Sequence, residues 1–417
     1  MSAQQSKPPK PRRNVLALTY WSFKDALVQS AVLPYLRMIR AQLPAGSLIF
    51  LVTLEQAHLR MDDAEARRAR ADLEAEGVRL VAFPYSRFGL VALLKWTAFI
   101  PRLWALCVSQ RIRHIHAWCT PAGGAGYILS RLTGAPLVLD SYEPHAESMV
   151  ELGHWTERSR GFRILFRLEK LQTRRARAAI ATSAGVREYA ERRYGVRLRR
   201  FYVKPASVDM ELFTPALSKD AALLSELGLE GKLVCVYAGK IGGIYLEQEI
   251  FDFFKTAADH WGERFRVLLL TDASDERVAA LMKAAGLDPR LVVKRFVPFR
   301  DVPRHMGLGD FAINPVRPVP TKRVCTSVKD GEYWAMGLPV VIPRDISDDS
   351  DIIRERRIGA VLDEFTPEAY RRAVGEIDEL LTTHTRAELA AKIRAVAAEH
   401  RDLSTRWRIY EELYRAG

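Results

Sequence analysis

The sequence has few cysteines and no long apolar run. Its four cysteines are scattered, and none forms a C-x-x-C pair, so the spacing of a disulfide framework or of a zinc site is missing. There is also no run of 18 apolar residues, so no membrane-spanning helix is expected. We therefore expect a protein of the reducing cytosol, whose buried cysteines serve as small apolar side chains.

Common nucleotide and nucleic-acid motifs are missing as well. The second half of the chain has no G-x-G-x-x-G and no G-x-x-x-x-G-K-[ST] segment, and we find no helix-turn-helix or zinc module. The acidic run "DISDDSD" (345–351) fits a polar loop that caps the next helix better than a metal site. We expect no nucleic-acid partner, no metal and no bound cofactor.

Positive charge is in excess over the whole chain. The 63 Lys and Arg residues against 50 Asp and Glu give a net charge of +13, which favours anionic partners such as nucleotides or lipid surfaces. The first stretch, "MSAQQSKPPKPRR" (1–13), is rich in proline and basic residues and lacks the apolar segment of a signal peptide. It predicts a disordered basic tail.

Short apolar runs alternate with longer amphipathic runs, which is the pattern of parallel βα units. The strand-like runs lie at 14–21, 47–54, 78–85, 114–119, 136–142 and 178–184, and then at 232–239, 265–272, 291–296, 311–316 and 339–343. Because 417 residues exceed what one core usually supports, the sequence predicts an α/β fold with two Rossmann-like domains. Their expected ranges are 14–210 and 211–397, with a linker near 203–220 and a C-terminal helix (398–417) that packs on the first domain. Since ligands bind beyond the carboxyl ends of parallel strands, we expect the domains to face each other across a cleft.

The segment "YAGKIGG" (237–243) ends a predicted strand with three glycines and a lysine. Gly239 permits a tight turn, Lys240 adds a charge at the strand end, and Gly242 and Gly243 let the backbone approach a ligand. The helix expected to begin near Tyr245 would add free N–H groups, and this combination suits a diphosphate. A plain glycine turn with a solvated lysine is the alternative.

The segment "TSVKDGEYWAMGLPVV" (326–341) places charges before an apolar helix face. The hydroxyls of Thr326 and Ser327 and the ammonium of Lys329 lie where phosphate oxygens would meet a helix N-terminus. Glu332, expected in the first turn, suits a ribose, because a carboxylate accepts hydrogen bonds from two neighbouring hydroxyls. Alternatively, Ser327 merely caps the helix and Glu332 complements the helix dipole.

A third cluster, "LDSYEPHAESM" (139–149), follows a strand of the first domain. Asp140, Glu143 and His145 gather there, where the hydroxyl of an acceptor would approach. His145 would position the acceptor or the donor sugar, and Glu143 or Asp140 would take a proton. A simple turn that begins near Pro144 is the alternative.

Four segments carry a resemblance to a known family. "TSVKDGEYWAMGLPVVIP" resembles the S-x-P-x-K-x-x-E-Y-x-A-x-G-x-P-V-V segment of GT-B glycosyltransferases, particularly of the retaining family 4. "RARAAIATSAGVREYAERRYGV" (175–196), "PASVDMELF" (205–213) and "YAGK" (237–240) resemble three further segments of these enzymes, in the expected order. The likeness extends over both domains, roughly residues 14–400.

The resemblance implies a nucleotide-sugar donor that the second domain holds. Lys240 and Lys329 would contact the diphosphate, Glu332 the ribose hydroxyls, and the loop at Val297 would meet the base. Two positions depart from the family pattern. Val324 stands where many members have an additional glutamate, and a Gly-Gly-Ile-Tyr stretch replaces a lysine before the first helix of the second domain. How the diphosphate is neutralised is therefore open.

The acceptor side is expected in the first domain. Ser22, Phe23 and Lys24 follow its first strand, where many family members have a Gly-Gly acceptor loop. Two aromatic and basic stretches, 93–113 and 157–178, suit docking on an anionic membrane. Core helices with solvated basic faces are the alternative for these stretches.

These segments together predict a glycosyltransferase that moves a sugar from a nucleoside-diphosphate donor to a glycan or lipid-linked saccharide, with retention and without a metal. Such an enzyme would serve cell-envelope polysaccharide synthesis from the cytoplasm, at the inner face of the membrane. Two alternatives stay open. One is a nucleotide-sugar epimerase on the same fold, and the other is a catalytically silent scaffold that binds nucleotide or membrane.

Overall fold

The computed structural model describes residues 11–25, 27–86 and 90–415, and it divides the chain into two compact units. Unit 1 comprises residues 1–204 and 405–417, and unit 2 comprises residues 205–404. The chain therefore passes between the units twice, after Lys204 and after Ser404, whereas the sequence placed the boundaries after residues 210 and 397. The predicted disordered tail lies outside the described residues as far as residue 10.

Unit 1 is built on a parallel sheet. Its described strands are β1 (Asn14–Leu18), β2 (Ile49–Glu55), β3 (Val78–Pro84), β4 (Ile112–Trp118), β5 (Leu137–Tyr142), β6 (Ala178–Ala181) and β7 (Phe201–Val203). They pair in the order β3-β2-β1-β4-β5-β6-β7. The central strands are continuous apolar runs because helices cover a parallel sheet on both faces. For example, Val15 and Leu16 of β1 and Ile180 of β6 have no exposed surface.

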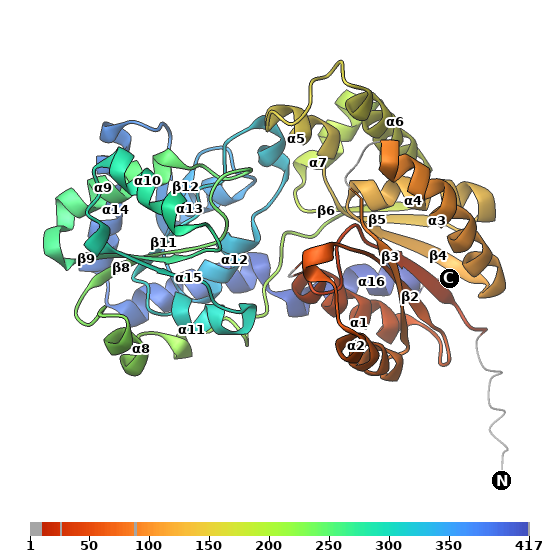
Figure 1. The fold of residues 1–417 in the computed structure, drawn as a ribbon, viewed down its shortest axis with the longest axis horizontal. Helices are drawn as coiled ribbons and strands as arrows, with labels where there is room; N and C mark the ends of the chain where they lie inside the picture. Colours follow the sequence, from red (N-terminus) through yellow and green to blue (C-terminus); the bar gives the residue numbers. More distant parts are fainter. Residues whose placement is uncertain (1–10, 26, 87–89, 416–417) are drawn as a thin grey trace, which may run out of the picture. The chain divides into compact units, whose positions relative to one another are not determined.

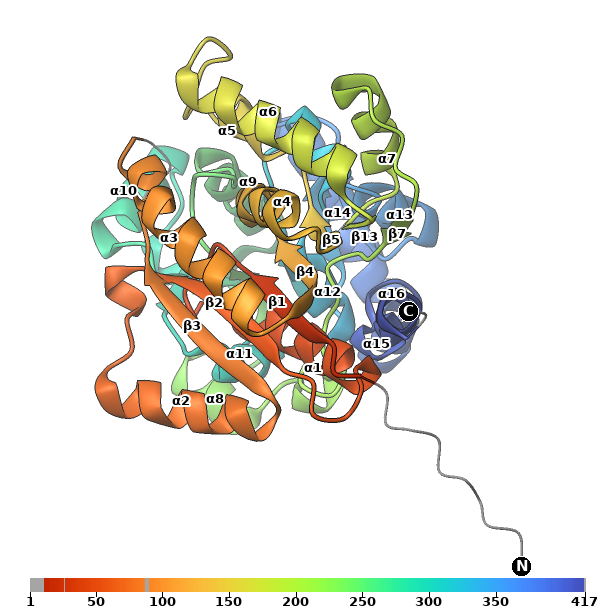
Figure 2. The same cartoon turned by 90° about the vertical axis from the view of Figure 1, so that its right-hand side faces the viewer.

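Helices cover both faces of this sheet. The described helices are α1 (Leu33–Gln42), α2 (Asp63–Ala75), α3 (Leu90–Ser109), α4 (Thr120–Thr133), α5 (His145–Glu151), α6 (Arg160–Arg175), α7 (Gly185–Tyr189) and α16 (Trp407–Tyr414), with the π-helical segments η1 (Val28–Val32) and η3 (Ala190–Tyr194) and the 3-10 turn η2 (Ala57–Leu59). Figure 1 and Figure 2 show α1, α2 and α16 on one face, and α3, α4 and α6 on the other. Helix α16 packs against α1, so the C-terminal helix returns to the first domain as predicted.

Unit 2 repeats this design with its own parallel sheet. Its described strands are β8 (Leu233–Ala238), β9 (Phe265–Leu270), β10 (Val292–Arg295), β11 (Phe311–Ile313), β12 (Val340–Pro343) and β13 (Gly359–Leu362), in the order β10-β9-β8-β11-β12-β13. The helices are α8 (Ala221–Glu226), α9 (Gln248–Trp261), α10 (Asp275–Ala285), α11 (Val302–Met306), α12 (Val328–Ala335), α13 (Asp349–Arg356), α14 (Pro367–Thr383) and α15 (Arg386–Arg401). Short turns complete the unit: η4 (Pro215–Leu217), η5 (Gly262–Arg264), η6 (Pro289–Leu291), η7 (Phe299–Asp301), η8 (Pro320–Val324) and η9 (Leu403–Arg406), the last of which continues into unit 1.

The two parallel sheets with flanking helices confirm the predicted α/β fold class. In unit 2, α9 packs against α14 and α12 packs against α15. The segments singled out in the sequence follow β1, β5, β8 and β10 directly, so each lies at the carboxyl edge of its own sheet, where such folds bind ligands. Within the described ranges, none of the helices combines the length and the apolar character that crossing a bilayer requires.

Candidate functional site

The loop after β8 lies against the lysine of α12. Gly239 donates its N–H to the carbonyl oxygen of Leu270 at 2.9 Å, which extends the β8–β9 pairing by one residue. A Cβ atom added at Gly239 would lie 2.3 Å from Cε of Lys329. Carbon atoms that are not bonded to each other do not approach so closely. In this arrangement the end of the Lys329 side chain occupies the space that a Cβ atom at position 239 would take, so a larger residue there would displace it. Lys240 is exposed, and its carbonyl oxygen accepts a hydrogen bond from the Tyr237 hydroxyl.

The next two glycines both use the left-handed backbone region. Gly242 has φ +85° and Gly243 has φ +67°, conformations that glycine adopts without steric cost. A Cβ at Gly242 would lie 2.3 Å from Oε1 of Glu247, whereas Gly243 faces open space. Helix α9 begins only at Gln248, later than the sequence predicted, so the loop between the glycines and the helix is longer than expected.

Tyr245 in this loop holds the ammonium of Lys329. Nζ of Lys329 donates to the Tyr245 hydroxyl at 2.7 Å and lies 4.2 Å from the centre of the ring. The loop itself is fixed, because the N–H of Leu246 donates to the carbonyl of Pro315 at 2.8 Å. Tyr245 belongs to the stretch where the resembling family usually has a lysine. The sequence did not identify it as a site residue, because an aromatic residue in a loop carries no recognisable signal of this kind.

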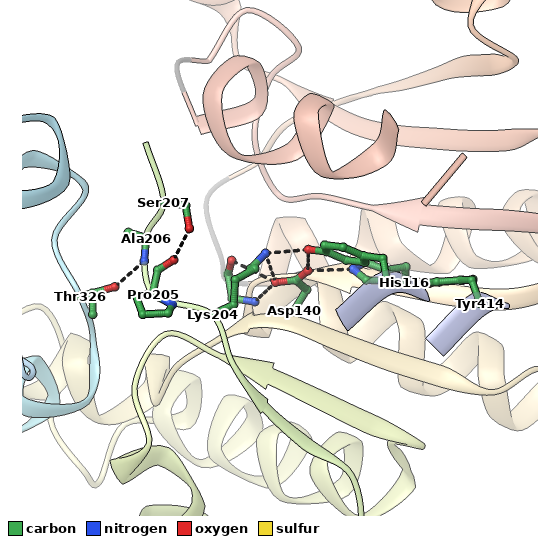
Figure 3. A network of polar contacts seen from close by, with 10 residues as sticks. His116, Asp140, Lys204, Pro205, Ala206, Ser207, Thr326 and Tyr414 are labelled. Carbon is green, nitrogen blue, oxygen red and sulfur yellow. Dashed lines mark hydrogen bonds and ion pairs between the residues drawn. The ribbon is translucent and has the colours of Figure 1, made fainter. Parts of the chain in front are cut away.

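The two hydroxyl residues before α12 have different environments. Oγ1 of Thr326 accepts a hydrogen bond from the N–H of Ala206 at 2.8 Å (Figure 3). Thr326 thus fixes the segment at the start of unit 2. Ser327 is the N-cap residue with extended backbone (φ −85°, ψ 133°), but its side chain makes no capping hydrogen bond. The alternative that Ser327 serves as a side-chain cap is therefore wrong.

Glu332 lies in the second turn of α12, and the acid of the first turn is Asp330. The expectation that Glu332 occupies the first turn is thus wrong, because the helix begins at Val328 and Glu332 is its fifth residue. Burial raises the pKa of Glu332 to about 7, against the effect of the Lys329 ammonium. Within the described part of the chain, no hydrogen bond or ion pair to the Glu332 carboxylate is found. Such a carboxylate suits a ligand that brings two hydroxyl donors.

Beneath the start of α12 lies a buried polar cluster that the sequence did not predict. Asp330 is fully buried, and burial raises its pKa to about 7 against the effect of Arg401. The Arg401 guanidinium is also buried, forms an ion pair with Asp349, and donates to the carbonyl of Ala206 at 3.4 Å. These residues are far apart in the sequence, so no local pattern could have joined them.

Two further positions of the predicted donor site lie elsewhere in unit 2. Val297 follows β10 and packs against the unit 2 core, next to Phe296, whose residue surface is 75% exposed. Val324 is buried at the end of η8, so the position of the usual additional glutamate is apolar here. Gly239, Lys329 and Tyr245 are the residues that direct contacts bring together.

Asp140, in the second half of β5, is the centre of a buried network (Figure 3). Lys204 lies 2.6 Å from Oδ1, Nε2 of His116 lies 3.1 Å from Oδ2, and the Tyr410 hydroxyl donates to Oδ2 at 2.8 Å. Because a carboxylate only accepts, Nε2 of His116 carries a proton, and Nδ1 then accepts from the Tyr414 hydroxyl at 2.7 Å.

The network keeps Asp140 ionised and out of reach of a substrate. Burial by itself would raise the pKa of Asp140, but the charge of Lys204 and the hydrogen bond from His116 outweigh burial and hold that pKa below its usual range. The side chain has no exposed surface. A general base must reach the proton that it removes. Because Asp140 is fully buried, it cannot take a proton from an acceptor, and its predicted role as a base is wrong.

Glu143 and His145 do lie together at the carboxyl edge of the unit 1 sheet. Nδ1 of His145 is 3.9 Å from Oε1 of Glu143, and both side chains are partly exposed. The Thr120 hydroxyl donates to the carbonyl of Glu143 at 2.6 Å. His145 is also the first residue of α5, so the segment is more than the simple turn at Pro144 that was the alternative.

The residues after β1 are engaged in contacts of their own. Ser22 is fully buried; its hydroxyl donates to the carbonyl of Leu54 at 3.2 Å and accepts from the N–H of Gln56 at 2.8 Å. Phe23 donates its N–H to a Glu55 carboxylate oxygen at 3.1 Å. The hydroxyl of Ser22 is thus structural, which contradicts its assignment to the acceptor side.

Lys24 is the exposed member of this segment. Its Nζ forms an ion pair with Glu65 at 3.0 Å, so it is partly neutralised. Among the residues that the structure describes, no group of three or more His, Cys, Asp or Glu side chains lies close enough to hold a metal ion.

Comparison with known proteins identifies the fold and a family likeness. Residues 34–207 match the model of the glycosyl transferase 4-like domain. A curated relative, the D-inositol 3-phosphate glycosyltransferase of Xylanimonas cellulosilytica, is 29% identical over 234 residues, which are 53% of this chain and 53% of the relative. The chain thus matches about half the length of this relative.

Solved structures resemble almost the whole chain. HepE of Anabaena, solved in complex with UDP, is 16% identical with a TM-score of 0.71, covering 96% of this chain and 99% of its own. WaaG, a glycosyltransferase involved in lipopolysaccharide biosynthesis, is 13% identical with a TM-score of 0.67, covering 97% of this chain and 100% of its own. Both units thus have counterparts in these proteins, so the chain has the two-domain GT-B fold, and its first unit resembles the glycosyl transferase 4-like domain.

Proposed function

We propose that this chain is a glycosyltransferase that moves a sugar from a nucleoside-diphosphate donor to a saccharide acceptor. The observation that carries the proposal is the arrangement at the start of α12. Lys329 passes over Gly239 and is held by Tyr245, while the Glu332 carboxylate nearby has no partner within the described residues. A cation beside a carboxylate without a partner matches a diphosphate linked to a diol.

The likeness to HepE supports the choice of donor. HepE has also been solved in complex with UDP-glucose, so UDP-glucose is the first donor to test. In the proposed complex Lys240 and Lys329 contact the diphosphate, Glu332 accepts from the ribose hydroxyls, and the loop at Val297 meets the base. Gly242, Gly243 and the Ser327 hydroxyl complete the proposed donor contacts.

The proposed chemistry follows from the charge that develops when the glycosidic bond breaks. The leaving diphosphate gains negative charge, and fixed cations stabilise that charge without rearrangement during the reaction. Lys240 and Lys329 serve this role, and we propose that transfer proceeds with retention and without a metal or other cofactor. His145 positions the reacting sugar or the acceptor, and Glu143 orients the imidazole from 3.9 Å.

The acceptor that we propose is a glycan or lipid-linked saccharide at an anionic membrane surface. Apolar side chains are exposed on three helices of unit 1 that pack side by side, α3, α4 and α6. They are Trp104 (44% exposed), Val108 (57%), Leu132 (57%) and Ile164 (42%). Exposed arginines accompany them, including Arg163 and Arg167 of α6. Apolar anchors with surrounding cations are the composition of interfacial binding, which supports the proposal that the protein works at the inner face of the membrane.

Turnover of UDP-glucose tests the activity. We expect release of UDP when membrane lipids from an envelope preparation are supplied as acceptor, with the same rate after addition of EDTA. A product formed from the donor alone, without an acceptor, would indicate an epimerase instead. Binding of donor with neither hydrolysis nor transfer would indicate a silent scaffold.

Flotation with vesicles tests the membrane partner. We expect the protein to bind vesicles that contain anionic lipid at low salt, and the binding to fade as salt is added, because screening weakens the attraction. Trp104→Ser together with Ile164→Ser should weaken binding at every salt concentration. The matched control is Leu27→Ser, an exposed apolar residue of unit 1 outside these helices. Binding that is absent even at low salt contradicts the membrane assignment.

A further inference from the structure

The helix that begins with His145 has no local cap. Its N-cap residue is Pro144, which has no polar side chain and makes no side-chain capping hydrogen bond. The first N–H groups of a helix lack partners within the helix, and a proline cannot supply one. The first N–H groups of α5 therefore need an acceptor from outside their own segment.

A carboxylate from another helix supplies the missing acceptor. Oε1 of Glu169, in the middle of α6, accepts a hydrogen bond from the N–H of Ala146 at 2.8 Å. The other oxygen of Glu169 accepts from the Tyr194 hydroxyl at 2.9 Å. Glu169 and Ala146 both have no exposed surface, so water does not compete for this contact.

The environment of Glu169 differs from that of Asp140. Asp140 lies against the Lys204 ammonium, whereas no ion pair to Glu169 is found among the described residues. Burial accordingly raises the pKa of Glu169 to about 8, although the hydrogen bonds from Ala146 and Tyr194 lower it. Burying a carboxyl group without a cation costs free energy, and an apolar side chain would fill the same space without that cost. What it does is hold the backbone beside His145.

We infer that Glu169 is a positioning residue for His145, acting through the backbone N–H of Ala146 as a remote cap of α5. The inference rests on the proposed function, in which His145 contacts the reacting groups. The contact needs an oxygen acceptor at Oε1, and either a carboxylate or a neutral amide provides one. Small displacements of a positioned group reduce turnover strongly, so the loss of this acceptor should lower kcat more than it changes KM for the donor.

Three variants separate positioning from stability. Glu169→Met keeps the volume but removes the acceptor, and we expect kcat to fall about tenfold with KM for UDP-glucose little changed. Glu169→Gln keeps an oxygen for Ala146 and should restore kcat to near the wild-type value. The matched control is Tyr194→Phe, which removes the second hydrogen bond of Glu169 but keeps the one from Ala146, and it should leave kcat within about twofold. If Glu169→Met does not fold, Glu169→Asp takes its place in the experiment. The shorter side chain of aspartate withdraws the carboxylate from Ala146 by one methylene.

A readout that needs no turnover separates this inference from the proposed function. In protein with ¹³C-labelled histidine, His145→Asn assigns the His145 signal. We expect that signal to shift in Glu169→Met and to return in Glu169→Gln. Wild-type kcat and an unshifted signal in Glu169→Met would overturn the inference. A wild-type protein that turns over no sugar nucleotide would overturn the function, while the His145 signal still decides whether Glu169 positions the imidazole.

Discussion

Lys329 and Tyr245 are joined twice, by a hydrogen bond of 2.7 Å to the hydroxyl and by contact of the ammonium with the ring at 4.2 Å. The ring face attracts a cation, and the hydroxyl fixes its direction. Tyr245 therefore holds the lysine side chain extended over Gly239. In the proposed donor complex, this arrangement gives Tyr245 a role in binding without a charge of its own.

Removal of the Tyr245 hydroxyl should weaken donor binding. Tyr245→Phe keeps the ring but loses the hydrogen bond, and we expect the Kd for UDP to rise about three- to tenfold. Tyr245→Ala loses both contacts and should have a larger effect. Isothermal titration calorimetry measures both. The control is Tyr127→Phe in α4 of unit 1, which should bind UDP as the wild type does; equal affinity in all three variants would show that Tyr245 has no role.

Loss of either lysine should reduce affinity for the diphosphate. Lys240→Ala and Lys329→Ala each remove a cation from the proposed pocket, and we expect the Kd for UDP to rise by about tenfold or more in each. Lys283→Ala, an exposed lysine of α10, controls for the change in net charge. If both site variants bind UDP with wild-type affinity by calorimetry, the donor site lies elsewhere.

The raised pKa of Glu332 should make donor binding depend on pH. Its value of about 7 means that the carboxylate is largely protonated at pH 6 and largely ionised at pH 8. The ionised form accepts two hydroxyl donors better than the acid does, so affinity for UDP should increase by about tenfold over this range. In Glu332→Gln the same titration should be flatter and the affinity lower. Identical pH profiles for the two proteins would exclude the ribose contact.

Breaking the Asp140 network should destabilise unit 1. Asp140→Asn leaves the buried Lys204 ammonium without its counter-charge, and removing one member of a buried pair costs about 3 to 5 kcal/mol. The double variant Asp140→Asn with Lys204→Met should recover part of this loss, since no buried charge remains. Thermal unfolding followed by circular dichroism compares the three proteins. A single variant as stable as the wild type would show that the pair contributes nothing.

Glu169 should produce the opposite pH dependence to a salt-bridged acid. Its pKa of about 8 in the folded chain lies above the value of about 4.5 that it has when unfolded, so the folded state binds the proton more tightly. The stability present at low pH is therefore lost as pH rises from about 4.5 to about 8, by roughly 1 to 3 kcal/mol. Glu169→Gln should lack this loss and become the more stable protein near pH 9. A difference in Tm between the wild type and Glu169→Gln that stays constant from pH 5 to pH 9 would contradict this prediction.

The fold was predictable because both sheets are parallel and buried. Buried parallel strands are continuous apolar runs, and each run that the sequence identified overlaps a strand of the structure. The strands that the sequence missed, β7 and β13, are short strands at the ends of their sheets. Edge strands are only half covered, so β13, which begins at Gly359, has no long apolar run to mark it.

The site was predictable only in part, because local spacing does not report long-range contacts. Glycines and lysines after strands identified the neighbourhood of Gly239 and Lys329. Asp140 was misassigned because the sequence near the end of a strand does not show whether an acid faces solvent or a buried lysine far along the chain. Here the acid meets Lys204. Glu169 had no signal at all, since it is one acid in an otherwise basic amphipathic helix.

The double passage of the chain between the units has a consequence for synthesis. All residues of unit 2 lie between Lys204 and Thr405, so unit 2 is complete in sequence before unit 1 is. Until residues 405–417 have left the ribosome, Lys204 and His116 lack Tyr410 and Tyr414, and the face of α1 that α16 covers is bare. Domains generally fold as units during synthesis, so here the unit that begins first is the one that finishes last.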